Sequence, residues 1–414
     1  FPDRAVASMA VFPWTDRLMP AYAPMPRAKR PEPGESRNPA IDALRGLAIL
    51  CVVLLHVQIH IPQEQSLLGK VLPAPLFNIV FRSGYYGVII FFVISGFLIT
   101  RTCLARWGSL AAVPWAPFLW RRFARIYPCL LLLLLVLAGL HWAQMPGFVI
   151  EDTSVARATA AAVTLHLNWL EAQVGYLPAA WNVLWSLSIE EAFYLAFPLL
   201  CLVSLAVGPR ALRLTLLLFV ALGPFARVAF TQNEIWADHS YLSGMDGIAI
   251  GCLAALAAAR LNRARHSYRR GLLLTGAALF ALVFLLRKAT SWLGLTALGL
   301  NVTLLEIGVA CLLIGWSLRT THPPRHNPAM AALRWIGHNS YEIYLTHMFP
   351  VLLLAAASCR NSGGAVSTWW RAGALTAASV LAILLAAMLG GLVARYYSAP
   401  MRRWLMRPGW VALR

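Results

Sequence analysis

An arginine and a histidine occur in one apolar stretch, residues 41–60, at a spacing that could support chemistry inside a membrane. Arg45 and His56 are eleven residues apart, which at about 100° per residue returns to within about 20° of the same helix face. The helix rise puts His56 roughly 16 Å further along the axis. An ionisable group at that depth is costly and indicates a functional site, although a histidine that only satisfies a neighbouring helix is the alternative. His60 follows at a metal-ligand spacing, but no HExxH motif and no third ligand accompany it, so we predict no metal site.

A serine and three arginines follow in the next two apolar stretches. Ser95 lies in the middle of "YYGVIIFFVISGFLITR", either as a small residue that permits close helix packing or as a hydroxyl that lines a polar cavity. The segment "WRRFARIYP" then places Arg121, Arg122 and Arg125 at the foot of a span. These arginines either anchor the helix to anionic lipid or bind phosphate through their forked donors.

Two adjacent carboxylates enter the apolar helix predicted at "WNVLWSLSIEEAFYLAFP". Glu190 and Glu191 suit proton handling or the binding of hydroxyl groups, whereas the plain alternative is a solvated helix N-terminus. Trp181, Trp185 and Tyr194 fit either an interfacial aromatic belt or a platform on which a sugar could stack.

Further ionisable residues lie in later spans. Arg227 and Asp246 fall near the ends of two predicted spans and either pair with each other or bind substrate. Glu306 is deep in another span and must be paired or neutral. In "IGHNSYEIYLTH", Tyr344 and His347 lie along one predicted span. His347 is either a functional residue or a structural one that forms a hydrogen bond to a neighbouring helix.

The composition is that of an all-α polytopic membrane protein. Of the 414 residues, 59% are hydrophobic and only 12% are charged, against about a quarter in soluble proteins. The mean hydropathy is +0.66. The net charge of +19 comes from short arginine clusters between apolar runs, which indicates membrane topology rather than nucleic-acid binding. The seven cysteines are scattered without a CxxC pair and predict no disulfide framework, and Cys359 is expected in an outer loop.

We expect three regions: a disordered cytoplasmic leader over residues 1–40, which contains eight prolines, a transmembrane domain over 41–400, and a basic cytoplasmic tail over 401–414. About ten membrane spans are predicted, with both termini cytoplasmic. They are 47–61, 85–103, 127–143, 188–207, 212–230, 242–259, 271–287, 297–318, 336–357 and 373–396.

A weaker apolar stretch at 158–170 would make an eleventh span. We reject it because it would move "RLNRARHSYRR" to the outer side, against the charge bias. Residues 144–188 then form a long outer segment that contains an interfacial or re-entrant helix. Arg287 and Lys288 are the main exception to the charge bias, since both fall on the outer side.

Six motifs, in this order, resemble the acyltransferase-3 family of bacterial integral-membrane O-acyltransferases. They are "DALRGLAILCVVLLH", "FFVISGFLI", "RRFARIYP", "WSLSIEEAFYL", "DGIAIGCLAA" and "NSYEIYLTH", and together they cover about 42–400. Members of this family modify lipopolysaccharide, exopolysaccharide, peptidoglycan and other glycans. The resemblance implies a location in the bacterial inner membrane, ten spans with cytoplasmic termini, and acetyl-CoA or a related acyl-CoA as donor, with no permanently bound cofactor.

The resemblance also implies roles for particular residues. The family's Arg–ten residues–His signature falls on Arg45 and His56, and its tryptophan–serine–leucine and glutamate motif begins at Trp185 and Ser186. Asp246 departs from the family pattern, because "SGMDGIAIG" lacks the arginine that many relatives carry near the aspartate. No SGNH hydrolase-type domain follows the tenth span, and we expect that the protein lacks it or obtains it in trans. The expected catalytic residues are Arg45, His56, Ser95 and Glu190; those for acyl-CoA are Arg121, Arg122, Arg125 and Tyr344; those for the acceptor are Trp185, Glu191, Tyr194, Arg227 and Asp246.

The expected reaction is acyl transfer from acyl-CoA to a glycan hydroxyl, with membrane lipid, acyl-CoA and the glycan as partners and no nucleic acid. His56 acts as general base or transient acyl carrier. Ser95 and Tyr344 are expected to donate hydrogen bonds to the thioester oxygen. A secondary transporter of a small anionic or sugar-like solute would also place ionisable residues in the membrane, and we keep it as an alternative. A non-enzymatic scaffold would leave these residues unexplained.

Overall fold

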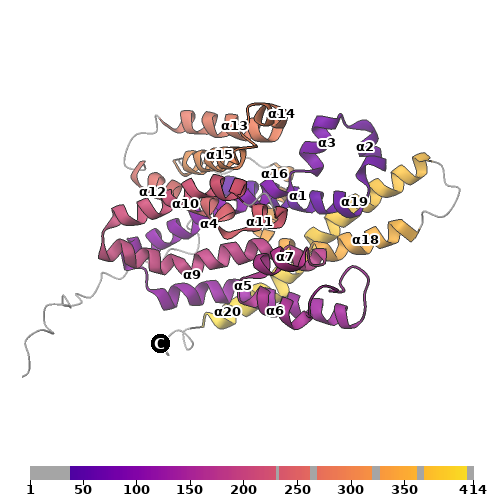
Figure 1. The fold of residues 1–414 in the computed structure, drawn as a ribbon, viewed down its shortest axis with the longest axis horizontal. Coiled ribbons are helices and arrows are strands. Elements are labelled where there is room, and N and C mark those ends of the chain that lie inside the picture. Colours follow the sequence, from indigo (N-terminus) through magenta and orange to yellow (C-terminus); the bar gives the residue numbers. More distant parts are fainter. Residues whose placement is uncertain (1–37, 230–232, 262–267, 319–326, 361–367, 408–414) are drawn as a thin grey trace, which may run out of the picture. The chain divides into compact units, whose positions relative to one another are not determined.

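The computed structural model describes residues 38–229, 233–261, 268–318, 327–360 and 368–407, all within one compact unit of residues 37–414. Residues 1–37 of the predicted leader lie outside these residues, as does 408–414 of the predicted tail, whereas Pro39 and Ala40 are already part of the first helix, so the leader ends earlier than predicted. The described chain is helical and contains no strand (Figure 1). The longer helices are α1 (Pro39–His60), α4 (Gly84–Trp107), α5 (Trp115–Trp142), α9 (Trp185–Ala206), α10 (Pro209–Ala229), α12 (Tyr241–Leu261), α13 (Arg269–Leu285), α15 (Leu300–Ser317), α18 (Met348–Arg360) and α19 (Thr368–Val393).

Shorter helices connect and cap these long ones. They are α2 (Leu67–Val71), α3 (Ala74–Phe81), α6 (Val155–Val163), α7 (Leu167–Val174), α8 (Ala179–Asn182), α11 (Glu234–His239), α14 (Arg287–Trp292), α16 (Pro328–His338), α17 (Ser340–Thr346) and α20 (Ala399–Leu405). A π-helical turn at Ala394–Ser398 joins α19 to α20.

The predicted fold class, an all-α polytopic membrane protein, is confirmed. By length and composition, eight helices of the described chain can cross a membrane, and α17 with α18 makes a ninth if this bent pair is one span. The predicted span at 271–287 corresponds to α13, which has 17 residues. At 1.5 Å per residue it is about 26 Å long, somewhat less than a bilayer core of about 30 Å.

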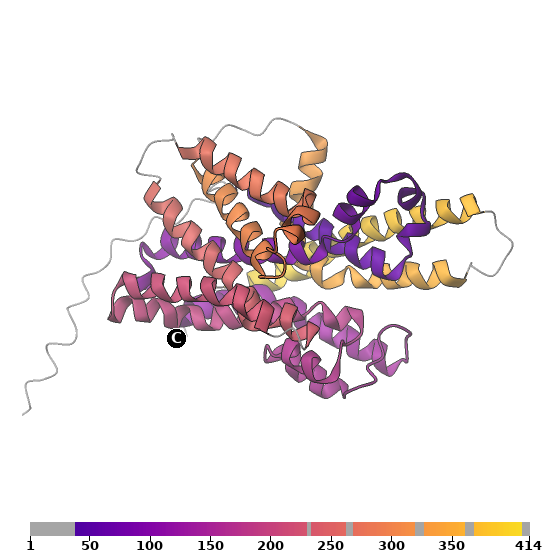
Figure 2. The same ribbon diagram turned by 45° about the horizontal axis from the view of Figure 1, so that its top comes forward.

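The weakly apolar stretch at 158–170 does not form one helix. It is divided between α6, of 9 residues, and α7, of 8 residues, and neither is long enough to span a bilayer. Both belong to the magenta group below α18 and α19 in Figure 2. Leu165, between the two helices, has a φ of 64°, a left-handed conformation that interrupts a helix. The single interfacial or re-entrant helix predicted here is therefore two short helices.

Close helix crossings hold the centre of the bundle together. A Cβ on Gly96 of α4 would come within 1.9 Å of the Ile248 carbonyl of α12, so only glycine permits this approach. A Cβ on Gly337 of α16 would likewise lie 1.8 Å from the Asp42 carbonyl of α1. These contacts fix α4 against α12 and α16 against α1. A Cβ on Gly87 of α4 would likewise lie 2.4 Å from the Ala48 carbonyl of α1, so the helices that carry Arg45 and Ser95 are also neighbours.

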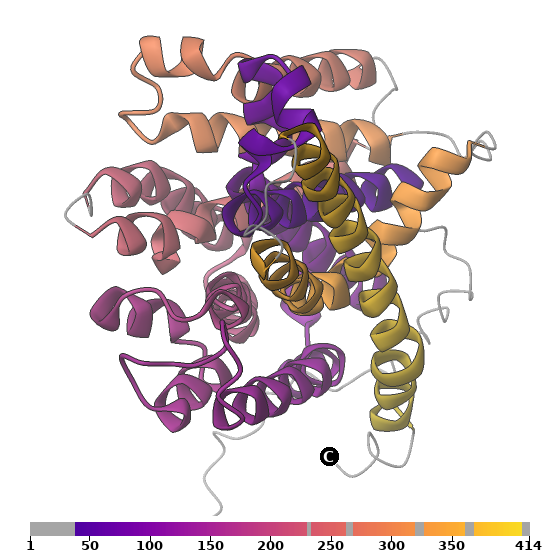
Figure 3. The same ribbon diagram turned by 90° about the vertical axis from the view of Figure 1, so that its right-hand side faces the viewer.

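The bundle has two chemically different ends. At the basic end lie the C-terminus of α4, the N-terminus of α5, α16 and α20; there Trp120 of α5 donates a 3.1 Å hydrogen bond to the Leu405 carbonyl of α20. At the other end, which faces the reader in Figure 3, α2 and α3 stand beside the start of α19. Leu67 N there donates to Thr376 Oγ1 at 3.0 Å.

Arg287, an exception to the charge bias, is bound by the protein itself. Its guanidinium donates to the Arg82 carbonyl at 3.1 Å and to the Ser83 hydroxyl. It also lies 5.0 Å from the centroid of the Tyr86 ring, a cation–π contact. A cation held in this way stabilises the junction of α3 and α4. This local role explains why an arginine occurs on the side predicted to be outer, against the charge bias.

Candidate active site

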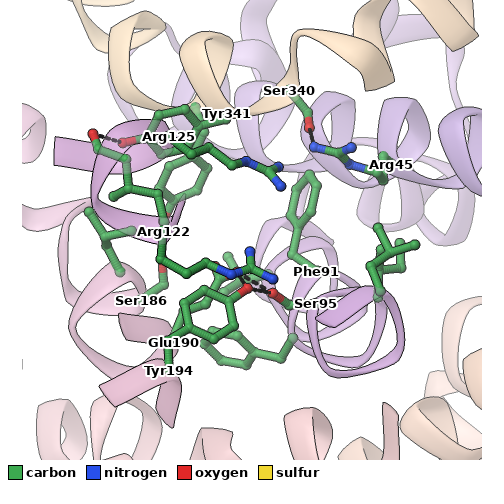
Figure 4. Close-up of a pocket in the computed structure, with 17 residues that line it drawn as sticks. Arg45, Phe91, Ser95, Arg122, Arg125, Ser186, Glu190, Tyr194, Ser340 and Tyr341 are labelled. Atoms are coloured by element: carbon green, nitrogen blue, oxygen red, sulfur yellow. Dashed lines mark hydrogen bonds between the residues drawn. The ribbon is translucent and has the colours of Figure 1, made fainter. Parts of the chain in front are cut away.

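A narrow cavity opens between α1, α4, α5, α9 and α17, and it contains most of the polar residues that the sequence singled out (Figure 4). Its volume is about 90 Å³. Apolar side chains of α4, among them Val88, Phe91 and Leu98, form much of the wall. The polar and charged residues that line it are Arg45, Ser95, Arg122, Arg125, Ser186, Glu190, Tyr194, Ser340, Tyr341 and Tyr344.

A second, larger cavity adjoins the first at the basic end of the bundle. Its volume is about 680 Å³. The two cavities share Arg45, Leu98, Arg122, Arg125 and Tyr341 as lining residues. The larger one is strongly basic, because arginines from α1, α5, the π-helical turn and α20 converge on it. These are Arg45, Arg122, Arg125, Arg395 and Arg402.

A compact hydrogen-bonded group of Ser95, Glu190 and Tyr194 occupies one wall of the narrow cavity. The Ser95 hydroxyl donates to Glu190 Oε1 and contacts the Tyr194 hydroxyl, and Tyr194 donates to the same Oε1 at 2.5 Å. Glu190 and Tyr194 reach one spot because they are four residues apart on α9. The Arg122 guanidinium lies 4.2 Å from the Tyr194 ring centroid. The Glu190 carboxylate therefore orients the hydroxyls of Ser95 and Tyr194, and the Arg122 guanidinium lies over the Tyr194 ring.

Glu191, the second carboxylate of the adjacent pair, points elsewhere. It is 4% exposed, its Oε1 has no hydrogen-bond partner, and it lines neither cavity. One residue along a helix turns a side chain by about 100°, so only one of two adjacent glutamates can face the cavity. The structure brings Glu190 to the site and not Glu191.

Arg45 and Tyr344 also lie on the cavity wall, each with a defined partner. Arg45 is 8% exposed and donates to the Ser340 hydroxyl at 2.9 Å. The Tyr344 hydroxyl is 2.7 Å from both the Val183 carbonyl and the Ser186 hydroxyl. A carbonyl only accepts, so the proton of Tyr344 goes to Val183 and that of Ser186 to Tyr344. Since the Ser95 proton goes to Glu190, neither Ser95 nor Tyr344 is free to be the predicted oxyanion donor in this arrangement.

His56 is not among the residues that line the narrow cavity; it pairs with a second histidine. His347 Nε2 lies 3.3 Å from His56 Nδ1, and the ring centroids are 4.9 Å apart at an interplanar angle of 66°. His347 is fully buried and comes one turn after the cavity residue Tyr344. The sequence had given His347 a helix-to-helix contact as an alternative, but not its partner. Within the described residues no group of three or more His, Cys, Asp or Glu side chains could hold a metal ion.

Arg227 and Asp246, predicted for the acceptor, form a buried ion pair away from both cavities. Their side chains are 6% and 0% exposed, and Arg227 Nη2 is 2.8 Å from Asp246 Oδ2. Arg227 also donates to the carbonyls of Gly299 and Ser243, at 3.1 and 2.8 Å, and to the Thr303 hydroxyl at 2.7 Å. Of the two roles the sequence left open, the structure shows the mutual pair.

Trp185 and Arg121 likewise lie outside the cavities. Trp185 is buried and stacks on the His239 ring at 3.9 Å between centroids, so it is neither an exposed belt residue nor a free stacking platform. Arg121 is exposed and lines neither cavity, whereas Arg122 and Arg125 line both. Helix geometry again separates adjacent residues onto different faces.

A buried acid that the sequence did not single out as a site residue lies beside this stack. Glu171 of α7 is 0% exposed and accepts hydrogen bonds from Leu177 N at 3.3 Å and Asn182 at 3.1 Å. Its Oε2 is 3.7 Å from His239 Nδ1. Burial raises the pKa of Glu171 to about 8, so the carboxyl is largely protonated at neutral pH. Its only sequence signal was an acidic residue within an otherwise apolar segment.

Several known proteins are similar in sequence to this chain. A family model described as an acyltransferase domain matches residues 38–388. Peptidoglycan O-acetyltransferase OatA of Listeria monocytogenes is 28% identical over 337 residues, which cover 76% of this chain and 49% of that protein. O-acetyltransferase OatA of Staphylococcus aureus is 25% identical over 390 residues, or 88% of this chain and 57% of that protein. The chain thus spans about half the length of these relatives, and no solved structure matches it. The chain belongs to the acyltransferase-3 family.

Proposed function

We propose that this protein transfers an acyl group, acetyl in the first instance, from acyl-CoA to a hydroxyl of a cell-surface or secreted glycan, with peptidoglycan as the leading acceptor. The observation that carries the proposal is the junction of the two cavities, where a wide arginine-lined chamber narrows into an apolar channel with a polar wall. The relatives named peptidoglycan O-acetyltransferases support the acceptor class.

The chemistry of CoA matches the two cavities in order. Phosphates of the nucleotide would lie among the arginines of the larger cavity, where charge-assisted and forked hydrogen bonds are strong. The slender pantetheine arm would extend along the apolar wall formed by Phe91 and Leu98. The thioester then approaches Ser186 and Tyr344, next to the pair of histidines, and the bulky nucleotide need not cross the membrane.

The transfer itself requires one base. His56 accepts the proton of the acceptor hydroxyl, whose oxygen forms a bond to the acyl carbon as the carbon–sulfur bond breaks. The sulfur of CoA leaves as a thiolate and takes the proton back from His56, which leaves an ester, a thiol and a neutral imidazole. Glu190 orients Ser95 and Tyr194 along the channel and balances the charge of Arg122.

Arginine variants test the donor site. Arg122→Ala and Arg125→Ala are each expected to weaken acetyl-CoA binding by about tenfold or more, because a hydrogen bond to a charged group contributes about 1.5–3 kcal/mol. Arg122→Lys should recover only part of the affinity, since lysine loses both the fork and the stacking on Tyr194. Binding would be measured by calorimetry on the purified protein in detergent.

The matched control for these variants is Arg121→Ala, which removes a neighbouring exposed arginine that lines neither cavity and should leave the affinity unchanged. If alanine at all three positions weakened acetyl-CoA binding equally, the arginines would act only through their general positive charge and not through specific contacts in the cavities. If the native protein did not bind acetyl-CoA at all, the donor assignment would be wrong.

We further propose an orientation in the bacterial inner membrane with both termini and the basic end in the cytoplasm. Single cysteines at Ser109 and Asp152, both exposed and at opposite ends of the bundle, would be introduced into a chain without native cysteines. Position 152 should react with a membrane-impermeant thiol reagent in intact spheroplasts, and position 109 only after lysis. Labelling of position 109 from outside would place the arginine-lined cavity on the wrong face for cytoplasmic CoA.

A further inference from the structure

The structure pairs His56 with His347, a second histidine that does not itself take the proton in the proposed reaction. We infer that His347 is a positioning residue: it holds His56 in the tautomer that carries its proton on Nδ1 and thereby leaves Nε2 as the basic nitrogen. This inference rests on the proposed function, in which His56 is the general base.

The hydrogen bonds of His347 define which of its nitrogens carries the proton. His347 Nδ1 lies 2.8 Å from the carbonyl oxygen of Tyr344, which can only accept, so Nδ1 must be the donor. In the neutral ring Nε2 then has a free lone pair and acts as an acceptor. The break between α17 and α18, with its bend of 40°, falls at His347, where this side chain bonds back to the preceding turn.

The same reasoning fixes the proton of His56. Its Nδ1 lies 2.9 Å from the Val52 carbonyl and 3.3 Å from His347 Nε2. Both neighbours are acceptors, so Nδ1 must carry a hydrogen that it shares between them. Val52 is four residues earlier on α1 and sets the direction of the ring within that helix, whereas His347 sets it from across the interface. Nε2 of neutral His56 is consequently unprotonated and available to a hydroxyl group.

This arrangement gives His347 a part in the reaction without contact with either substrate. When Nε2 of His56 takes the proton of the acceptor hydroxyl, the ring becomes an imidazolium and its Nδ1–H bond to His347 becomes charge-assisted. A partner that fixes the tautomer and stabilises the cation is the role that a carboxylate has behind the histidine of serine hydrolases. Here the partner is uncharged, so the ground state does not require a buried anion.

The test compares two replacements of His347. His347→Phe keeps an aromatic ring but removes the acceptor that His347 provides and leaves only the Val52 carbonyl for His56 Nδ1. It should lower kcat by about 10–100-fold, the loss typical when a residue that orients a functional side chain is replaced. KM for acetyl-CoA should stay within about twofold of native. His347→Gln offers a carbonyl oxygen to His56 and should restore most of the lost kcat. The assay is release of CoA from acetyl-CoA by the purified full chain in proteoliposomes, with soluble peptidoglycan fragments as acceptor.

Two further variants separate the possible failures. His60→Phe makes the same change one turn further along α1, at a histidine whose Nε2 has no hydrogen-bond partner, and should keep native kcat. His56→Ala should be inactive, and adding His347→Phe to it should cause no further loss, because the two residues act as one unit. If His56→Ala retains activity, the proposed function fails. The positioning role alone is overturned if His56→Ala is inactive while His347→Phe is fully active. It is also overturned if His347→Phe lowers kcat no more than His347→Gln does.

Discussion

Replacing His56 with alanine is expected to lower acyl transfer by about 10²–10⁴-fold, the contribution typical of a general base. The variant lacks the Nε2 lone pair that takes the proton from the hydroxyl of the glycan. Among the described residues, no other histidine contacts His347 and could replace His56. The measurement is the ester content of cell-wall glycan, by mass spectrometry, in cells that carry the variant as the sole copy.

Folding must be excluded as the cause of this loss. His56 is partly exposed and lies on α1, whose core contacts are made by residues such as Ile49, Val53 and Val57. The variant should therefore reach the membrane in normal amount and elute as the native protein does from a sizing column in detergent. Full glycan esterification with His56→Ala would remove this residue from catalysis and would return the pair of histidines to a purely structural role.

Replacing Asp246 with alanine is expected to lower the free energy of unfolding by about 3–5 kcal/mol, the cost of leaving a buried charge without its partner. Arg227 would keep three neutral acceptors, on Gly299, Ser243 and Thr303. It would lose the carboxylate of Asp246, which lies 2.8 Å from its Nη2 in the native protein. Unfolding would be followed by denaturant titration in detergent micelles.

A matched control exists at an exposed ion pair that is also made by an arginine. Glu64 and Arg82 lie 3.2 Å apart with side chains 53% and 54% exposed, so Glu64→Ala should cost less than about 1 kcal/mol. If Asp246→Ala unfolds as the native protein does but loses affinity for glycan fragments, the acceptor-binding role predicted from the sequence would hold and the structural role would be wrong.

The sequence by itself determined the class of the protein and the faces of its helices. Long apolar runs interrupted by arginine clusters are stable as membrane-spanning helices, and nine of the ten predicted spans each overlap one long helix, of which α13 is short. The tenth, at 336–357, is divided among α16, α17 and α18. Helical periodicity also determined that Arg45 and His56 share a face of α1, and that Glu190 and Tyr194 share a face of α9. These are local properties, set by rise and turn along one helix.

Only the tertiary structure decided which partner each of those faces meets. His56 and His347 are 291 residues apart, and Arg227 and Asp246 lie on different helices, so no periodicity links them. Adjacent residues diverged for the same reason: packing turned Glu190 and Arg122 towards the cavities and left Glu191 and Arg121 outside them. A helix fixes the angle between its side chains, but the neighbouring helices decide which angle faces the cavity.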